Sequence, residues 1–194
     1  MGFFDKLFGK KESTSTSTPQ TPVEDSQELM DDDQFWEIIA LSKSRSKGDY
    51  DAQQEELRKE LLKLEALDIL KFGNRFRTYV GLAYTWEMWG AAYIMHGGCS
   101  DDCFSDFRGW LIGKGEETFL NALQDPETLT TLEYDEEDEW EGLSYVHFTT
   151  YEEKTGQRIP QGIIQNLEVT GQDWEEVGDD LKNMFPKLWA KWGF

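Results

Sequence analysis

Cysteine and histidine are scarce in this sequence, and both scarcities narrow its chemistry. The 194 residues include two cysteines and two histidines. Cys99 and Cys103 lie four positions apart, and the N-terminus has neither the long apolar run nor the small-residue cleavage site of a secretory signal. We therefore expect a cytoplasmic protein in which both thiols are reduced.

The same scarcity weakens any metal-site prediction. His96, Cys99 and Cys103 have the spacing H-x-x-C-x-x-x-C, which differs from the usual zinc motifs, and His147 would have to serve as the fourth ligand. The sequence has no second C-x-x-C pair. We expect no metal and no cofactor.

Basic residues are also few. Nineteen Lys and Arg stand against 39 Asp and Glu, which gives a formal net charge of -20. A field of this sign opposes association with phosphate backbones, so we expect no nucleic-acid partner. Two explanations of the acidity stay open: solubility, or steering toward a partner protein with a basic surface.

Long apolar runs and strand-like alternation are nearly absent. Residues 78–95 form one stretch of membrane-span length, with Glu87 as its single charge. Its mid-span carboxylate and its small content of Leu, Ile and Val favour a buried central helix over a membrane span. Residues 163–169 are the one stretch that suggests an extended segment. These features predict an all-α fold of six to eight helices in a single compact domain.

The composition divides the chain into three parts. Residues 1–11 predict a short amphipathic helix that an anionic membrane surface would order. Residues 12–30, rich in Ser, Thr and Pro, predict a disordered linker, and residues 31–194 predict the helical domain. The alternative for the first part is a disordered or partner-docked tail. The membrane-contacting residues would be Phe3, Phe4, Leu7, Phe8, Lys6, Lys10 and Lys11.

Helix signals recur along the predicted domain. Asp31 and two following aspartates suit the start of a helix that ends before Gly48. Further helices are predicted from about residue 51, over 66–77 with a bend at 73–74, over 78–95, from 101 to about 113, over 143–155, and within 171–194. Glu87 should find a cation or hydrogen-bond donors, or else take up a proton. An ion pair with Arg75, Arg77 or Arg108 is the favoured outcome.

The stretch MHGGCSDDCFSDFRGW, residues 95–110, admits two interpretations. The first is a helix–helix corner in which glycines end one helix and Ser100 caps the next. The second is an active site with a raised carboxyl pKa, whose catalytic candidates are Glu87, Asp101, Asp102, Arg108, His96 and Cys99. A ligand pocket on the aromatic surface is a third hypothesis, with Trp86, Trp89, Tyr93 and Trp110 as candidates.

Several segments resemble an uncharacterised bacterial family, domain of unknown function 4240. They are DDDQFWEIIALS, YTWEMWGAAYIMHGGCSDDCFSDFRGWLIGKGEETFLNAL, YEEKTGQRIP and DWEEVGDDLKNMFPKLW. The resemblance spans roughly residues 33–194 of the printed sequence. It implies a shared, mainly helical fold and carries over no activity, cofactor or catalytic residue.

Three functional hypotheses follow. The first is a non-enzymatic interaction or regulatory module, such as an acidic inhibitor or immunity-type protein, held reversibly at the inner face of the membrane. The second is an enzyme acting on a small polar substrate through its carboxylates and arginine. The third is a small-ligand sensor without chemistry.

Overall fold

The computed structural model describes residues 24–134, 141–164, 168–176 and 178–194. The predicted amphipathic segment and most of the predicted linker therefore lie outside the described residues. Residues 24–30, the end of that linker, lie against the domain: Met30 is buried, and its amide donates to the carbonyl of Lys71 at 3.1 Å.

The all-α prediction is confirmed, with more helices than the six to eight expected. The described residues contain nine α-helices and two 3-10 helices, and no strand apart from an isolated bridge between Thr85 and Thr170. The elements are α1 (Asp32–Ser46), α2 (Tyr50–Leu61), α3 (Ala66–Leu82), α4 (Trp86–Met95), α5 (Asp101–Gly113), α6 (Glu116–Gln124), η1 (Pro126–Thr131), η2 (Leu143–Tyr145), α7 (Val146–Thr155), α8 (Asp180–Met184) and α9 (Pro186–Trp192).

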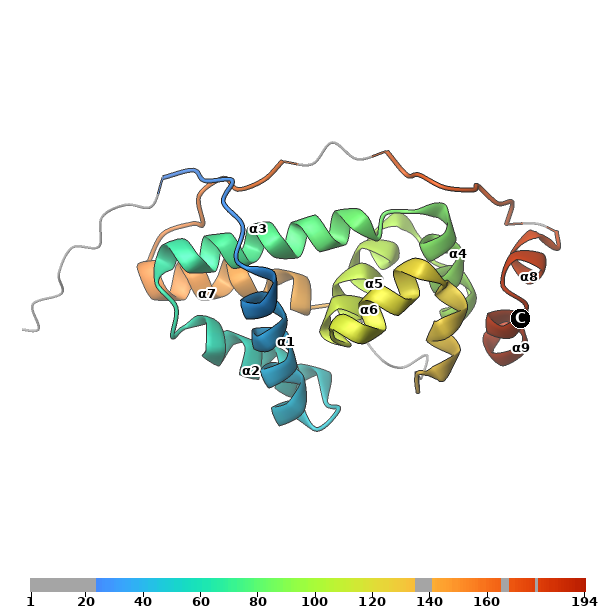
Figure 1. Ribbon diagram of the computed structural model, residues 1–194, viewed down its shortest axis with the longest axis horizontal. Coiled ribbons are helices and arrows are strands. Elements are labelled where there is room, and N and C mark those ends of the chain that lie inside the picture. The colour runs from blue at the N-terminus through green and yellow to red at the C-terminus, as the bar shows by residue number, and fades with distance from the viewer. Residues whose placement is uncertain (1–23, 135–140, 165–167, 177) are drawn as a thin grey trace, which may run out of the picture.

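Helix α3 is the central helix of the fold (Figure 1). Helix α7 runs alongside it, α1 and α2 lie on one side, and α4, α5 and α6 gather around its C-terminal end. The core between these helices is aromatic. The ring of Phe35 on α1 stacks on that of Phe72 at 4.8 Å, and Trp36 donates its indole N–H to the Tyr79 hydroxyl at 3.0 Å. Burial of such large rings contributes strongly to the stability of the fold.

The predicted helix over residues 78–95 is wrong, because this stretch forms the end of α3 and all of α4. Thr85 separates them: its hydroxyl accepts a hydrogen bond from the amide of Met88 at 3.1 Å and caps α4. The amide of Trp86 donates to the carbonyl of Thr170 at 2.8 Å. The Thr85 cap and the hydrogen bond to the distant Thr170 carbonyl therefore keep α3 and α4 as separate helices.

Residues 73–74, which allow a bend, lie inside α3, and the helix continues through them. Both residues serve the packing of other segments. Gly73 faces the ring of His147, and the side chain of Asn74 bonds three backbone groups of two crossing segments. Gly73 therefore allows His147 to approach α3 closely, and the Asn74 amide joins α3 to two other segments.

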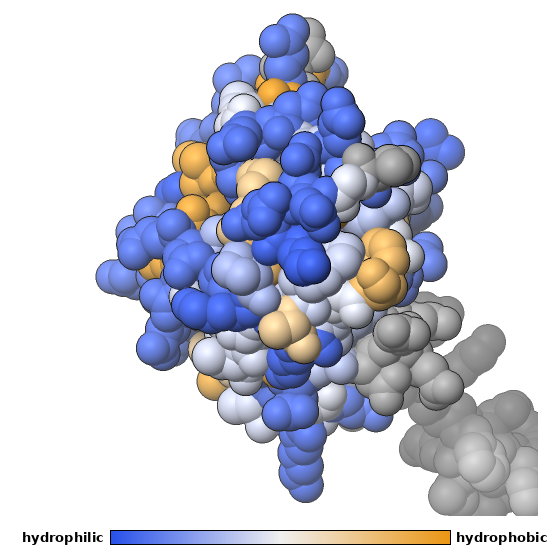
Figure 2. All heavy atoms as spheres, turned by 90° about the vertical axis from the view of Figure 1, so that its right-hand side faces the viewer, coloured by the Kyte–Doolittle hydropathy of each residue, from blue (hydrophilic) through white to orange (hydrophobic). Residues whose placement is uncertain are grey.

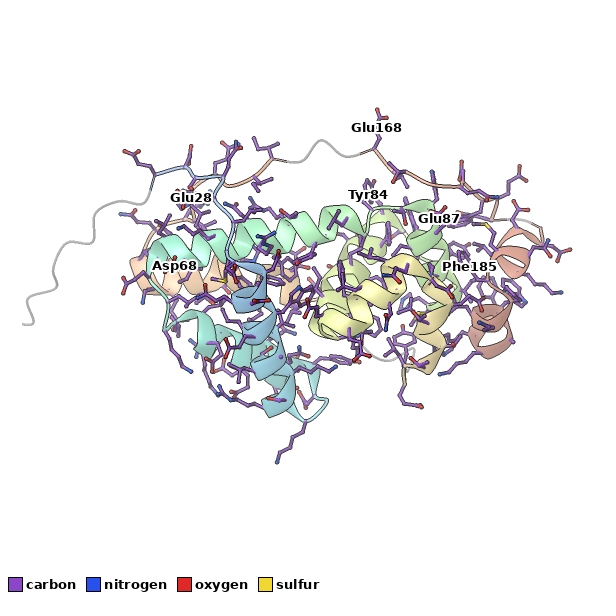
Figure 3. All side chains as sticks on the ribbon, viewed as in Figure 1. Glu28, Asp68, Tyr84, Glu87, Glu168 and Phe185 are labelled. Carbon is purple, nitrogen blue, oxygen red and sulfur yellow. A yellow bond between two sulfur atoms is a disulfide. The ribbon has the colours of Figure 1, made fainter. Side chains whose placement is uncertain are left out.

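The segment between α7 and α8 returns along α3 to the opposite end of the molecule (Figure 1). There α8 and α9 pack on α4, and Leu181 and Phe185 fill the space that a side chain at Gly90 would need. Figure 3 shows Glu87 and Phe185 at this end, with Glu168 projecting outward from the returning segment. Among the described residues, no helix is both long and apolar enough to cross a bilayer.

Candidate functional site

The stretch 95–110 forms the corner between α4 and α5. Gly97 and Gly98 have φ values of 65° and 125°, a region that favours glycine, and the amide of Gly98 donates to the carbonyl of Tyr93 at 2.9 Å. Ser100 accepts a hydrogen bond from the amide of Cys103 at 3.2 Å. Ser100 therefore caps α5 as predicted, and the corner ends one helix and begins the next.

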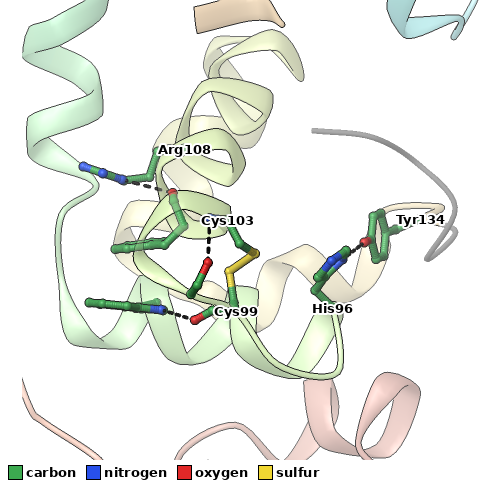
Figure 4. Close-up of a disulfide and its surroundings, with 8 residues drawn as sticks. His96, Cys99, Cys103, Arg108 and Tyr134 are labelled. Atoms are coloured by element: carbon green, nitrogen blue, oxygen red, sulfur yellow. Dashed lines mark hydrogen bonds between the residues drawn. A yellow bond between two sulfur atoms is a disulfide. The ribbon is translucent and has the colours of Figure 1, made fainter. Parts of the chain in front are cut away.

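The two cysteines of this corner form a disulfide (Figure 4). The expectation of reduced thiols is therefore wrong for this structure. Cys99 directly precedes the cap of α5 and Cys103 lies in its first turn, which brings their Cα atoms to 5.3 Å. The indole N–H of Trp89 donates to the carbonyl of Cys99 at 2.9 Å. Cys99 is thus engaged and is not available as a thiolate nucleophile in this state.

Glu87 has a different partner from the predicted cation. Its carboxylate accepts a hydrogen bond from the amide of Gln172 at 2.8 Å and lies against Gly171, where a Cβ would be only 1.9 Å from its Oε2. No ion pair joins Glu87 to an arginine of the described residues. The prediction of an ion pair is therefore wrong: Glu87 fixes the returning segment at the start of α4.

Arg108 is enclosed by carbonyls and rings. It is 8% exposed, donates to the carbonyls of Phe104 at 3.2 Å and Val80 at 3.1 Å, and its guanidinium lies over the rings of Tyr84 and Phe104. Burial lowers the pKa of Arg108 to about 10. Its described partners, two carbonyls and two rings, hold it on the inside of the bundle.

The remaining catalytic candidates are spread over the surface of the corner. Asp101 and Asp102 are exposed in the first turn of α5, where a negative charge suits the helix dipole. His96 is exposed, and its Nδ1 lies 2.7 Å from the hydroxyl oxygen of Tyr134 (Figure 4). The structure therefore does not bring the candidate carboxylates, Arg108 and His96 together around one cavity.

The aromatic pocket candidates pack on one another. Trp86 and Trp89 stack with ring centroids 5.5 Å apart, and Trp174 of the returning segment contacts Tyr93 at 5.0 Å. Trp110 is 3% exposed and lines a cavity of about 20 Å³, which holds about one water molecule. At this end the surface is mostly hydrophilic, and its hydrophobic side chains lie in small separate groups (Figure 2).

A larger pocket lies elsewhere, between α3, α5 and α7. Its volume is about 290 Å³, close to the lower limit for small-molecule sites. Apolar surface forms most of its wall, with three hydroxyls, one cation and one imidazole among the lining side chains. The lining residues are Phe76, Arg77, Val80, Ser105, Ser144, Tyr145, His147, Phe148 and Ile163.

His147 is the buried polar group of this pocket. Its side chain is 2% exposed, and neither ring nitrogen has a hydrogen-bond partner among the described residues. Burial, with a smaller contribution from the nearby charge of Arg77, lowers the pKa of His147 to about 3. The ring is therefore neutral near pH 7 and offers one N–H donor and one acceptor nitrogen.

Two glycines allow the polar side chains to approach the neighbouring helices. A Cβ at Gly73 on α3 would lie 2.5 Å from Cδ2 of His147, and a Cβ at Gly109 on α5 would lie 2.1 Å from Oγ of Ser144. Ser144 and His147 thus press against different helices, and no hydrogen bond joins them. They do not form a nucleophile–base pair.

The wall of the pocket depends on the segment that follows α7. Asn74, fully buried on α3, accepts a hydrogen bond from the amide of Ile163 at 2.9 Å. Arg77, one turn along α3, donates to the carbonyl of Ile163 at 3.3 Å. These contacts hold Ile163 over the pocket. Among the described residues, no three His, Cys, Asp or Glu side chains cluster as a metal ion would require.

No local pattern in the sequence indicates this pocket. In the sequence, Arg77 is a candidate only as the partner of Glu87, and His147 only as a fourth zinc ligand. The two residues lie on helices that are distant in sequence, so their proximity is not visible there. A usable signal existed in the predicted helix over residues 143–155, whose apolar positions left His147 among buried neighbours.

One family model matches this chain. It is described as "Protein of unknown function (DUF4240)" and matches residues 30–153. The chain belongs to the DUF4240 family. The match includes α1 to α6 and most of α7, and it ends well before residue 194, the end of the expected resemblance.

The pocket is part of the DUF4240 region apart from one residue. Ile163, together with α8 and α9, lies beyond the matched residues. The returning segment of this DUF4240 protein thus adds one wall to a pocket that the matched helices build. No curated protein and no solved structure matches the chain.

Proposed function

We propose that this DUF4240 protein is a non-enzymatic regulatory module that binds a small molecule in the pocket between α3, α5 and α7. One observation carries the proposal: His147, 2% exposed and without a partner among the described residues, lines a cavity of about 290 Å³. An unsatisfied buried polar group costs about 1–3 kcal/mol. A ligand that bonds the imidazole, after a turn of the ring toward the cavity, would recover part of this cost.

The chemistry of the pocket favours binding over catalysis. A base with a pKa of about 3 accepts a proton poorly at neutral pH, and Ser144 is turned toward α5. The carboxylates and the cation that an enzyme hypothesis requires lie at the α4–α5 corner, engaged with backbone groups or exposed. The small-ligand hypothesis is therefore favoured, at a different place from the predicted aromatic surface.

A thermal-shift screen of small metabolites on the full chain tests this proposal. The matched variant is Ser105→Trp, because Ser105 is exposed on α5 and lines the pocket, so a large ring there blocks the opening at little cost in folding. At least one compound should raise the melting temperature of the parent and leave the variant unchanged. Equal shifts in both proteins, or no shift in either, would contradict the proposal.

The sequence also supports a partner and a location for such a module. The net charge of -20 favours a partner protein with a basic surface. Residues 1–11, outside the described residues, would attach the protein reversibly to the cytoplasmic face of a membrane. Sedimentation with anionic lipid vesicles tests the attachment, since Phe4→Glu should release the protein. Equal binding of parent and variant would remove the membrane proposal.

A further inference from the structure

Arg77, at the edge of the pocket, is a cation with no carboxylate partner among the described residues. Its described contacts are the carbonyl of Ile163 at 3.3 Å and the ring of Phe148, whose centroid lies 5.2 Å from the guanidinium carbon. No ion pair joins it to an Asp or Glu of the described residues, although the chain has 39 of these against 19 Lys and Arg. Arg75 and Arg58, also on helices, do pair with carboxylates.

Burial makes this isolation costly. Desolvation lowers the pKa of Arg77, and no carboxylate offsets it. A guanidinium has five N–H donors in a planar fork, and the described contacts of Arg77 use one of them. With respect to the described residues, the cation therefore keeps donors that suit a bidentate oxyanion.

Arg108 differs from Arg77 in the number of groups that surround its guanidinium. Arg108 also lacks a carboxylate, yet two carbonyls and two aromatic rings surround it, and it is 8% exposed. Arg77 is less buried and lines the cavity. Of these two unpaired arginines, Arg77 is the one that a ligand can reach.

The rest of the wall defines the body of the ligand. Phe76, Val80, Phe148 and Ile163 are apolar, and three hydroxyl side chains and the neutral ring of His147 complete the wall. A volume of about 290 Å³ equals roughly ten times the volume of a water molecule in the liquid, which suits a single ring with one or two substituents. The pocket thus combines one cation with an open, largely apolar hollow of ring size.

We propose that the pocket binds a small organic anion, a carboxylate or phosphate monoester on an aromatic or branched apolar body, with its oxyanion on Arg77 and its body among Phe76, Val80 and Phe148. This inference rests on the proposed ligand-binding function. The negative field of the whole chain opposes anions at long range, but salt screens it over about 8 Å at physiological ionic strength. The local contact with Arg77 therefore decides the selectivity.

A set of ring-sized probes of matched shape tests the ligand class on the full-length protein. Benzoate and phenyl phosphate are the anions, benzamide is the neutral analogue of benzoate, and benzylamine is the cation. Dissociation constants come from ligand-detected NMR. Benzoate should bind at least about tenfold more tightly than benzamide, and benzylamine should not bind, because a charge-assisted hydrogen bond contributes more than a neutral one.

Variants then locate the contact. Arg77→Gln should weaken benzoate by about 10- to 150-fold and bring it level with benzamide. Lys182→Gln removes the same charge from an exposed position on α8 and should leave all affinities unchanged. If Arg77→Gln fails to fold, the comparison of benzoate with benzamide on the parent protein still decides the ligand class.

The outcomes separate this inference from the function on which it rests. If benzamide binds the parent as tightly as benzoate while Ser105→Trp abolishes both, the pocket binds ligands but the anionic class is wrong. If no probe binds the parent, or if Ser105→Trp leaves binding intact, the pocket and the ligand class both fail.

Discussion

Replacing Asn74 by Ala should loosen one wall of the pocket and destabilise the whole domain. The side chain of Asn74 is fully buried on α3 and makes three hydrogen bonds. Its amide nitrogen donates to the carbonyls of Ser26 at 2.8 Å and Glu28 at 2.9 Å, and its oxygen accepts from the amide of Ile163 at 2.9 Å. Asn74 thus anchors two segments to α3: the residues that precede α1 and the residues around Ile163 that follow α7.

The magnitude follows from these three contacts. Each buried hydrogen bond contributes about 0.5–1.5 kcal/mol net, so Asn74→Ala should lower the free energy of unfolding by about 2–4 kcal/mol. Urea unfolding followed by circular dichroism measures the change. Asn121→Ala is the matched control, because Asn121 is exposed on α6, and it should change stability by less than about 0.5 kcal/mol.

Hydrogen exchange distinguishes a local effect from a global one. In Asn74→Ala the amides of residues 26–30 and 161–164 should exchange faster than the core of α3, since those segments lose their anchor first. A loss of stability below about 0.5 kcal/mol, or unchanged protection of the Ile163 amide, would refute the assigned role of Asn74.

Three further predictions concern the imidazole and the corner. Burial lowers the pKa of His147 to about 3, below its unfolded value of about 6.5, so its contribution to stability is complete above pH 6.5 and is lost as the pH falls toward 3. Between pH 7 and pH 5, the free energy of unfolding measured with urea should fall by about 2 kcal/mol because of this group. The fall should be absent in His147→Gln and kept in His96→Gln. Equal losses in both variants would contradict the burial of His147. Gly73→Ala should cost about 1–3 kcal/mol in the same assay, because the new Cβ would lie 2.5 Å from the imidazole, and a stabilised variant would contradict that packing. Without reductant, the intact mass of the unfolded protein should be lower than that of the dithiol form by two hydrogens. Reduction of the Cys99–Cys103 bond should lower the free energy of unfolding by about 2 kcal/mol. Free thiols in the sample kept without reductant would contradict the disulfide.

Local signals in the sequence predicted much of the fold correctly. The aspartates at the start of α1 and Ser100 before α5 act through hydrogen bonds within a few residues, which residue type and position reveal directly. The all-α class followed equally well from periodicity. By contrast, the break at Thr85 needs a carbonyl from residue 170, and no local pattern announces such a partner.

The site was harder to predict for the same reason. The sequence favoured a cation over hydrogen-bond donors as the partner of Glu87, but a backbone amide of the returning segment bonds it. Arg77 and His147 come together only when α3 and α7 pack side by side, as Figure 1 shows. Sequence position places such residues on helices, but tertiary packing decides which of their faces meet.

The scarcity of histidine allows a direct test of the central claim that the pocket receives a ligand. The two imidazoles of the chain lie apart, His147 in the pocket and His96 at the exposed corner, so their ring proton signals in NMR report on the two places separately. Titration of the full-length protein with benzoate should shift the His147 signals saturably and leave those of His96 in place. Movement of the His96 signals alone, or no movement of either, would contradict the account.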